Sequence, residues 1–223
     1  MKKNLFAEAI AKFFLGVVLV GVLIFLPAGT LRFFGGWLFM GVLFIPMFCA
    51  GLVMLVKNPN LLLSRLDAKE KRAEQDLVVK LSGLMFLVGF ILAGLDFRFG
   101  WMPLPIWVHW VAAGLFLVAY ILYAEVLREN TYLSRTIEVQ ENQQVVSTGL
   151  YGIVRHPMYA VTLLLFLSMP FVLGSVLSFL CFLCYPVLIV KRLKDEELFL
   201  EQGLPGYKEY KQKVKYRLIP GIW

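Results

Sequence analysis

The sequence predicts an all-α integral membrane protein with four transmembrane helices, a C-terminal helical hairpin and a cytoplasmic subdomain. The first observation is composition: 60% of the 223 residues are hydrophobic and 17% are charged, with a mean hydropathy of +0.75. A soluble domain has roughly 45–50% apolar and about 25% charged residues. The second observation is a series of apolar runs of membrane-spanning length. The third is the uneven distribution of Lys and Arg between the segments that connect those runs.

Four apolar runs have the length of a transmembrane helix, which needs about 20 residues to cross the hydrocarbon core. They are residues 9–28, 35–56, 77–95 and 105–124. The first run follows Lys2 and Lys3, as the apolar part of a signal peptide would. No small-residue cleavage site closes it, so we interpret it as a retained helix.

A fifth apolar stretch, residues 158–190, is too long for one crossing, because at about 1.5 Å per residue it would reach about 50 Å. Pro170 and the Gly174-Ser175 pair near its middle mark a turn. This pattern predicts a hairpin of two short or tilted helices. Residues 61–76 begin apolar and end charged, which predicts an interfacial helix. Residues 130–149 are polar and predict an ordered cytoplasmic connector.

Basic residues orient the predicted helices by the positive-inside rule. Two groups of them mark the cytoplasmic side: Lys57, Arg65, Lys69, Lys71 and Arg72, then Lys191, Arg192, Lys194, Lys208, Lys211, Lys213, Lys215 and Arg217. The loops after the first and third runs hold only Arg32 and Arg98. We therefore expect a multi-pass protein of the cell membrane with both termini and the 125–157 segment in the cytoplasm. Trp101, Trp107 and Trp110 would line the opposite interface. The net charge of +7 is then a signal of orientation, and no nucleic-acid partner is predicted.

The densest cluster of polar and glycine residues is 149–159, GLYGIVRHPMY, where the connector meets the hairpin. Gly149 and Gly152 allow backbone to approach a ligand closely. Pro157 suits the first turn of the following helix. The start of that helix offers free N–H groups to an acceptor such as a carboxylate. The alternative is an interfacial anchor, since Arg, His and Tyr are common where helices meet headgroups.

A second cluster, residues 191–198, follows the hairpin. Arg192 and Glu196 stand four residues apart on one helix face, so an ordinary ion pair on a solvated helix end is the alternative interpretation. A hairpin would return this helix end to the Arg155–Tyr159 turn. Two polar clusters that meet at one membrane surface predict a ligand pocket.

The other polar and thiol residues are assigned to structure. Residues 203–220, rich in aromatic and basic side chains, are interpreted as a helix under the pocket or on the headgroups. Cys181 and Cys184 form a CxxC within an apolar run and are interpreted as small hydrophobes. His109 would be an interfacial polar residue. The sequence has no HExxH motif or Walker loop, and no metal site is predicted.

Three runs carry a resemblance to a known family: VVSTGLYGIVRHPMY, DEELFL and GYKEYKQKVKYRLIPGIW. Their order and spacing over residues 130–223 resemble the isoprenylcysteine carboxyl methyltransferase family, whose wider relatives include membrane phospholipid N-methyltransferases. The resemblance implies a catalytic subdomain over residues 129–223, including the hairpin, that binds S-adenosyl-L-methionine. Residues 1–128 would be transmembrane helices, and their role toward a substrate is left open.

The resemblance also implies roles for individual residues. Arg192, Glu196 and His156 would be catalytic, with Arg192 orienting an acceptor carboxylate. The cofactor-binding set would be Gln140, Gln143, Gln144, Val145, Val146, Gly149, Tyr151, Arg155, His156, Pro157, Met158, Tyr159, Glu196 and Glu197. An ionised carboxylate acceptor needs no general base, whereas an amine or a thiol must lose a proton, for which His156 is the nearest candidate.

The expected function is methyl transfer to a lipid-like or prenylated acceptor at a carboxylate. Two enzyme alternatives stay open: a phospholipid N-methyltransferase, and an NADPH-dependent membrane reductase of the sterol-reductase type, which has a somewhat similar Arg-His-x-Tyr turn. The Glu196-Glu197 pair favours methyl transfer. A scaffold or small transporter would leave the spacings of both polar clusters unexplained, and the repeated halves usual in transporters are not visible.

Overall fold

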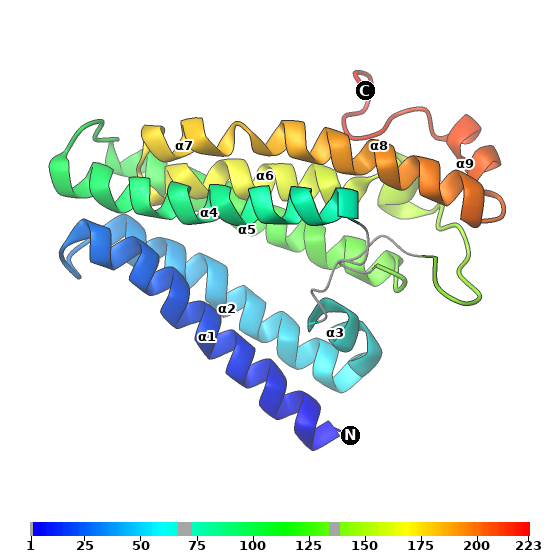
Figure 1. Ribbon diagram of the computed structural model, residues 1–223, viewed down its shortest axis with the longest axis horizontal. Helices are drawn as coiled ribbons and strands as arrows, with labels where there is room; N and C mark the ends of the chain where they lie inside the picture. The colour runs from blue at the N-terminus through cyan, green and yellow to red at the C-terminus, as the bar shows by residue number, and fades with distance from the viewer. Residues whose placement is uncertain (1, 67–72, 134–138) are drawn as a thin grey trace.

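The computed structural model describes residues 2–66, 73–133 and 139–223 (Figure 1). Within these ranges the chain consists of helices, their connections and one isolated antiparallel bridge between Pro103 and Ser175. The predicted all-α class is therefore confirmed for the described residues. Lys69, Lys71 and Arg72 of the predicted cytoplasmic loop lie outside them.

The long N-terminal helices match the predicted apolar runs and extend beyond most of their ends. They are α1 (Lys2–Ala28), α2 (Phe34–Lys57), α4 (Ala73–Phe99) and α5 (Ile106–Glu129), with the short α3 (Pro59–Leu66) after α2. The C-terminal region holds the 3-10 turn η1 (Gly149–Gly152), α6 (Pro157–Leu173), α7 (Val176–Phe182), α8 (Tyr185–Gly203) and α9 (Tyr207–Lys213).

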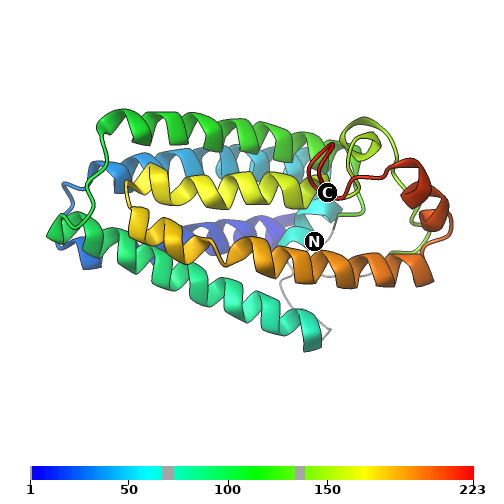
Figure 2. The ribbon, with the colours of Figure 1, turned by 90° about the horizontal axis from the view of Figure 1, so that it is seen from above.

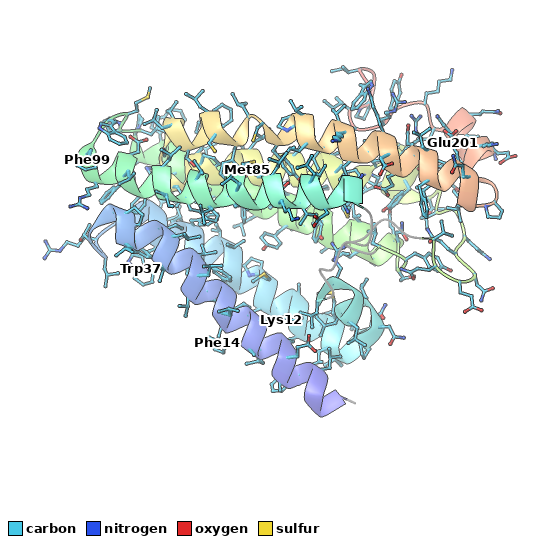
Figure 3. The ribbon with its side chains drawn as sticks, in the orientation of Figure 1. Lys12, Phe14, Trp37, Met85, Phe99 and Glu201 are labelled. Atoms are coloured by element: carbon cyan, nitrogen blue, oxygen red, sulfur yellow. The ribbon has the colours of Figure 1, made fainter. Side chains whose placement is uncertain are left out.

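Five segments of the described chain are long and apolar enough to cross a membrane: Leu5–Ala28, Phe34–Lys57, Gln75–Phe99, Ile106–Glu129 and Val176–Gly203. The sixth, Pro157–Leu173, is shorter, with 17 residues. Such a series is that of a multi-pass membrane protein. Large apolar side chains such as Phe14 and Trp37 are more than half exposed and lie on the outer surface of α1 and α2 (Figure 3).

The connections separate into two ends of the molecule (Figure 1). One end, here named the loop end, holds the connections at residues 29–33, 100–105 and 174–175. The opposite end holds the start of α1, the short α3, the end of α8 and α9. This grouping agrees with the predicted placement of both termini on one side. Which side faces the cytoplasm stays a prediction.

The predicted hairpin exists, but its second arm is longer than expected. Gly174 adopts a left-handed conformation (φ 80°) that ends α6, and the Ser175 side chain accepts a hydrogen bond from the backbone N–H of Ser178 to start α7. Pro170 lies in the last turn of α6 rather than in the connection. The second arm continues to Gly203, because residues 191–203 are polar yet rich in Leu, Lys and Glu, which favour helix. Figure 2 shows α6 between α5 and this arm.

Of the predicted interfacial helix over residues 61–76, residues 67–72 lie outside the described ranges. Helix α3 covers Pro59–Leu66, whereas Ala73 onward already belongs to α4. The polar start of α4 continues directly into an apolar span, so a window on hydropathy alone begins the span too late. In the predicted connector, the described residues 130–133 and 139–148 form turns and irregular backbone between α5 and η1.

Close helix contacts hold the N-terminal helices to the rest of the bundle near the loop end. A Cβ on Gly94 would lie 2.5 Å from the carbonyl oxygen of Ile24, and one on Gly35 would lie 2.6 Å from that of Leu173. Only glycine permits such backbone approach. The buried residues of α2 lie in its first half and are Gly35, Gly36, Phe39 and Phe44. Towards the opposite end, α1 and α2 diverge from the other helices (Figure 1).

A buried carboxylate ties the connections at the loop end together. Asp96 is 3% exposed and accepts hydrogen bonds from the hydroxyl of Ser175 at 2.6 Å and from the N–H of Met102 at 3.0 Å. His109 lies nearby, and its Nδ1 donates to the Val172 carbonyl at 2.9 Å, because a carbonyl oxygen only accepts. His109 is thus a structural residue near the predicted interface.

Candidate functional site

The end opposite the loop end contains a pocket formed by the connector, the start of α6, the end of α8 and α9. Its walls bring together the two polar clusters that the hairpin was predicted to join. The lining residues are Asn130, Tyr132, Leu133, Gln143, Gln144, Val145, Val146, Tyr151, Arg155, His156, Met158, Tyr159, Arg192, Glu196, Leu200, Leu204, Tyr207 and Tyr210.

The floor of the pocket begins at η1, which the end of α5 holds in place. The carboxylate of Glu129 accepts the N–H of Leu150 with both oxygens, at 3.1 and 2.9 Å. Gly149 has a positive φ of 51°, and a Cβ there would overlap the Glu129 carboxylate. Glycine is therefore required at position 149 by local geometry. Gly149 itself does not line the pocket.

The start of α6 is joined to the C-terminal segment. The N–H of Arg155 donates to the carbonyl of Tyr216 at 2.9 Å, and that of His156 donates to Arg217 at 3.0 Å. Pro157 occupies the first turn of α6, as its fixed φ favours. Pro157 does not line the pocket. These bonds present the side chains of residues 155, 156 and 159 to the pocket.

Beside the pocket, Glu197 is the centre of a buried ionic cluster. Its carboxylate accepts from Arg155 Nε at 2.7 Å and from Arg217 Nε at 2.9 Å, and His156 Nε2 lies 3.3 Å away. Glu197 is 3% exposed and does not line the pocket. Arg155 also donates to the carbonyls of Val214 and Lys215, both at 2.8 Å. The structure thus gives Glu197 a structural position, because its two carboxylate oxygens are used inside the protein.

Its neighbour Glu196 faces the pocket. The hydroxyl of Tyr159 donates to the Glu196 carboxylate and accepts from Arg192 Nε at 3.1 Å. One oxygen atom therefore connects a lining anion on α8 to a lining cation one turn earlier. The ring of Tyr159 also stacks on His156, with the centroids 5.7 Å apart. An i, i+4 ion pair between Arg192 and Glu196 was the alternative interpretation of the sequence, and in the structure the hydroxyl of Tyr159 on α6 contacts both side chains.

Two tyrosines of α9 line the pocket, although the sequence assigned residues 203–220 to structure alone. Tyr210 donates to the carbonyl of Tyr151 at 2.7 Å. The buried hydroxyl of Tyr207 has no hydrogen-bond partner among the described residues. Burial, with the negative charges of Glu197 and Glu196, raises the pKa of Tyr207 above its ordinary value. This hydroxyl therefore stays protonated and available to donate to a ligand. The Tyr-x-x-Tyr spacing on a short helix was the available signal.

The connector supplies the remaining wall, from which the side chain of Gln140 is turned away. Gln143, Gln144, Val145 and Val146 line the pocket. Gln140 does not, because its side-chain amide donates to the Tyr132 carbonyl at 2.8 Å and its N–H donates to Gln143 at 2.8 Å. The residues that the sequence missed are Asn130, Tyr132, Leu133, Leu200, Leu204, Tyr207 and Tyr210.

No group of three or more His, Cys, Asp or Glu side chains within residues 2–66, 73–133 and 139–223 could hold a metal ion. The polar chemistry at the pocket comes instead from carboxylate, guanidinium, imidazole, amide and phenol groups.

Comparison with known proteins gives two findings. Residues 107–205 match the family model described as phospholipid methyltransferase. That segment contains the whole pocket lining except Tyr207 and Tyr210. The Delta(14)-sterol reductase of Mus musculus is 33% identical over 91 residues, which is 40% of this chain and 22% of the reductase. The chain therefore aligns with less than a quarter of that protein.

Proposed function

We propose that this chain is a membrane methyltransferase that binds S-adenosyl-L-methionine in the pocket and methylates a lipid-like or prenylated acceptor at a carboxylate. The observation that carries the proposal is the convergence of both polar clusters on one pocket at the ends of apolar helices. The match of residues 107–205 to the phospholipid methyltransferase family supports it, because nearly all of the pocket lies within that segment.

The pocket residues fit such a cofactor. The unpartnered hydroxyl of Tyr207 is a buried donor that a ligand would satisfy. Glu196 offers a carboxylate to ribose-type hydroxyls, and its negative charge suits a sulfonium nearby. Gln143 and Gln144 could hold the polar edge of a base, with Val145 and Val146 against its face. When bound, S-adenosylmethionine supplies an electrophilic methyl group.

The protein's own groups would act by positioning and charge. Arg192 can hold an acceptor carboxylate by a planar two-point contact, which a lysine cannot form. An ionised carboxylate needs no proton removed, so orientation and exclusion of water would supply most of the rate enhancement. An amine acceptor would have to lose a proton to a base. A carboxylate only accepts, so His156 Nε2 must donate its N–H to Glu197. Nδ1 is then the only nitrogen of this ring that could act as that base.

The cofactor test is binding of S-adenosylhomocysteine to the purified protein by calorimetry. The unaltered chain should bind it, and Glu196→Ala should weaken binding about ten- to a hundredfold, because a hydrogen bond to a charged group contributes about 1.5–3 kcal/mol. Glu201→Ala is a matched control on the same helix, since Glu201 pairs with Lys211 outside the pocket. Absence of binding by the unaltered chain would refute the proposal.

The acceptor test compares an N-acylated S-prenylcysteine with phosphatidylethanolamine as substrates for labelled methyl transfer. If a carboxylate is the acceptor, only the prenylcysteine becomes labelled. Arg192→Ala should then reduce turnover far more than S-adenosylhomocysteine affinity, and Arg192→Lys should restore turnover only in part. Labelling of the phospholipid amine alone would assign the phospholipid N-methyltransferase function instead.

The second candidate function is an NADPH-dependent membrane reductase, and the similarity to the mouse Delta(14)-sterol reductase favours it. The two candidates differ in the ligand that stabilises the protein. Thermal stabilisation by NADPH without stabilisation by S-adenosylhomocysteine would select the reductase.

A further inference from the structure

A buried glutamine of α4 contacts the pocket wall from outside the segment that matches the methyltransferase family. Gln75 is 1% exposed. Its amide nitrogen donates to Asp195 Oδ2 at 2.5 Å, and its amide oxygen accepts from Arg192 Nη1 at 3.2 Å. Both partners lie on α8, so the first turns of α4 and the polar part of α8 are joined at the level of the pocket.

We propose that Gln75 is a positioning residue that fixes the guanidinium of Arg192 before an acceptor binds. This inference rests on the proposed function, in which Arg192 orients the acceptor. The charges of its two partners determine the orientation of the amide. A carboxylate only accepts and a guanidinium only donates, so the nitrogen must face Asp195 and the oxygen must face Arg192.

Two contacts from different helices then set the plane of the guanidinium. Gln75 on α4 holds Nη1, and Tyr159 on α6 holds Nε at 3.1 Å. A planar group fixed at two of its atoms cannot rotate about its long side chain. Preorganisation of this kind lowers the cost of ordering the residue when the acceptor arrives. The N-terminal helices would therefore contribute to the site, although residues 107–205 hold most of its lining.

The first test is a double-mutant cycle on turnover with the prenylcysteine probe. Gln75→Ala should reduce kcat about tenfold or more, the loss expected when a charged group loses a hydrogen-bond partner. It should leave S-adenosylhomocysteine affinity unchanged. In an Arg192→Ala background the same substitution should add no further loss, because its effect passes through the guanidinium.

Val78→Ala is the matched control. Val78 is 3% exposed and lies one turn further along α4. Its truncation should lower the melting temperature through lost packing and leave kcat unchanged. A rescue variant completes the set: Gln75→Glu with Asp195→Asn restores a complementary acceptor and donor, so it should recover part of the turnover that Gln75→Glu alone loses.

The second test needs neither cofactor nor acceptor. Phenylglyoxal modifies guanidinium groups, and mass spectrometry of peptides from the purified protein reports the rate at Arg192. Gln75→Ala should accelerate modification at this position, whereas Val78→Ala should not.

Equal modification rates in Gln75→Ala and the unaltered protein would overturn the inference, as would additive losses in the cycle. A chain that fails to bind S-adenosylhomocysteine would instead refute the proposed function. The modification experiment would still report whether Gln75 positions Arg192, so the two failures are distinguishable.

Discussion

The adjacent residues Glu196 and Glu197 should respond differently to substitution by glutamine: Glu197→Gln should lower stability, and Glu196→Gln should lower S-adenosylhomocysteine affinity. Glu197 compensates the buried cation of Arg155, whose side chain is 5% exposed, and the partly exposed Arg217. Removing one member of a buried ion pair costs roughly 3–5 kcal/mol. We expect the lower value of this range. Arg155 still donates hydrogen bonds to two backbone carbonyls, and the amide oxygen of the new glutamine can accept one more. Glu197→Gln should therefore destabilise the protein by about 3 kcal/mol and lower its melting temperature by about 6–12 °C.

The assay is thermal unfolding in mild detergent, followed by S-adenosylhomocysteine calorimetry at a temperature where all variants are folded. Glu196→Gln should melt nearly as the unaltered protein does but lose affinity, because Glu196 lines the pocket. Glu201→Gln controls for the loss of a charge on α8. Its pair with Lys211 is partly exposed and contributes under about 1 kcal/mol. If Glu197→Gln melted normally and lost affinity as Glu196→Gln does, the structural role given to Glu197 would be refuted.

Three further predictions concern the fold. Cysteines introduced at Lys208 and Trp101, in a background without the native cysteines, should react with an impermeant maleimide from opposite sides of the membrane; labelling from one side would contradict the two-ended arrangement. Gly94→Ala should destabilise by about 1–3 kcal/mol through overpacking against α1, whereas Gly83→Ala, with nothing within 4 Å of its Cβ position, should not lower the melting temperature. Asp96→Asn should lower the melting temperature by the equivalent of about 1–3 kcal/mol, since it weakens two buried hydrogen bonds, and an unchanged temperature would show that the loop end does not depend on them.

The membrane spans could be predicted because each depends on a local property, the length of an apolar segment relative to the thickness of the hydrocarbon core. The ends of polar helices could not. The second arm of the hairpin runs to Gly203, since helix propensity persists where hydrophobicity stops. The start of α4 at Ala73 was hidden for the same reason.

The pocket could be predicted as far as the hairpin brings two motifs together. Which glutamate faces it could not, because successive helix residues point about 100° apart and packing sets the rotation of α8. Tyr207 reaches the pocket through a reversal at Gly206, which has a φ of 82°. Gln75 carries no local signal, since one glutamine in a polar stretch resembles any other.

The hydroxyl of Tyr159 has a consequence for how sequences of this kind can vary. The hydroxyl donates its one hydrogen bond to the Glu196 carboxylate, and its oxygen accepts a hydrogen bond from Arg192 Nε. A phenylalanine at position 159 would remove the hydroxyl that contacts both the Glu196 carboxylate and the Arg192 guanidinium. Substitution at any one of these three positions therefore changes which residues are acceptable at the other two. Among homologues, positions 159, 192 and 196 should vary together, as one inherited unit rather than as three independent sites.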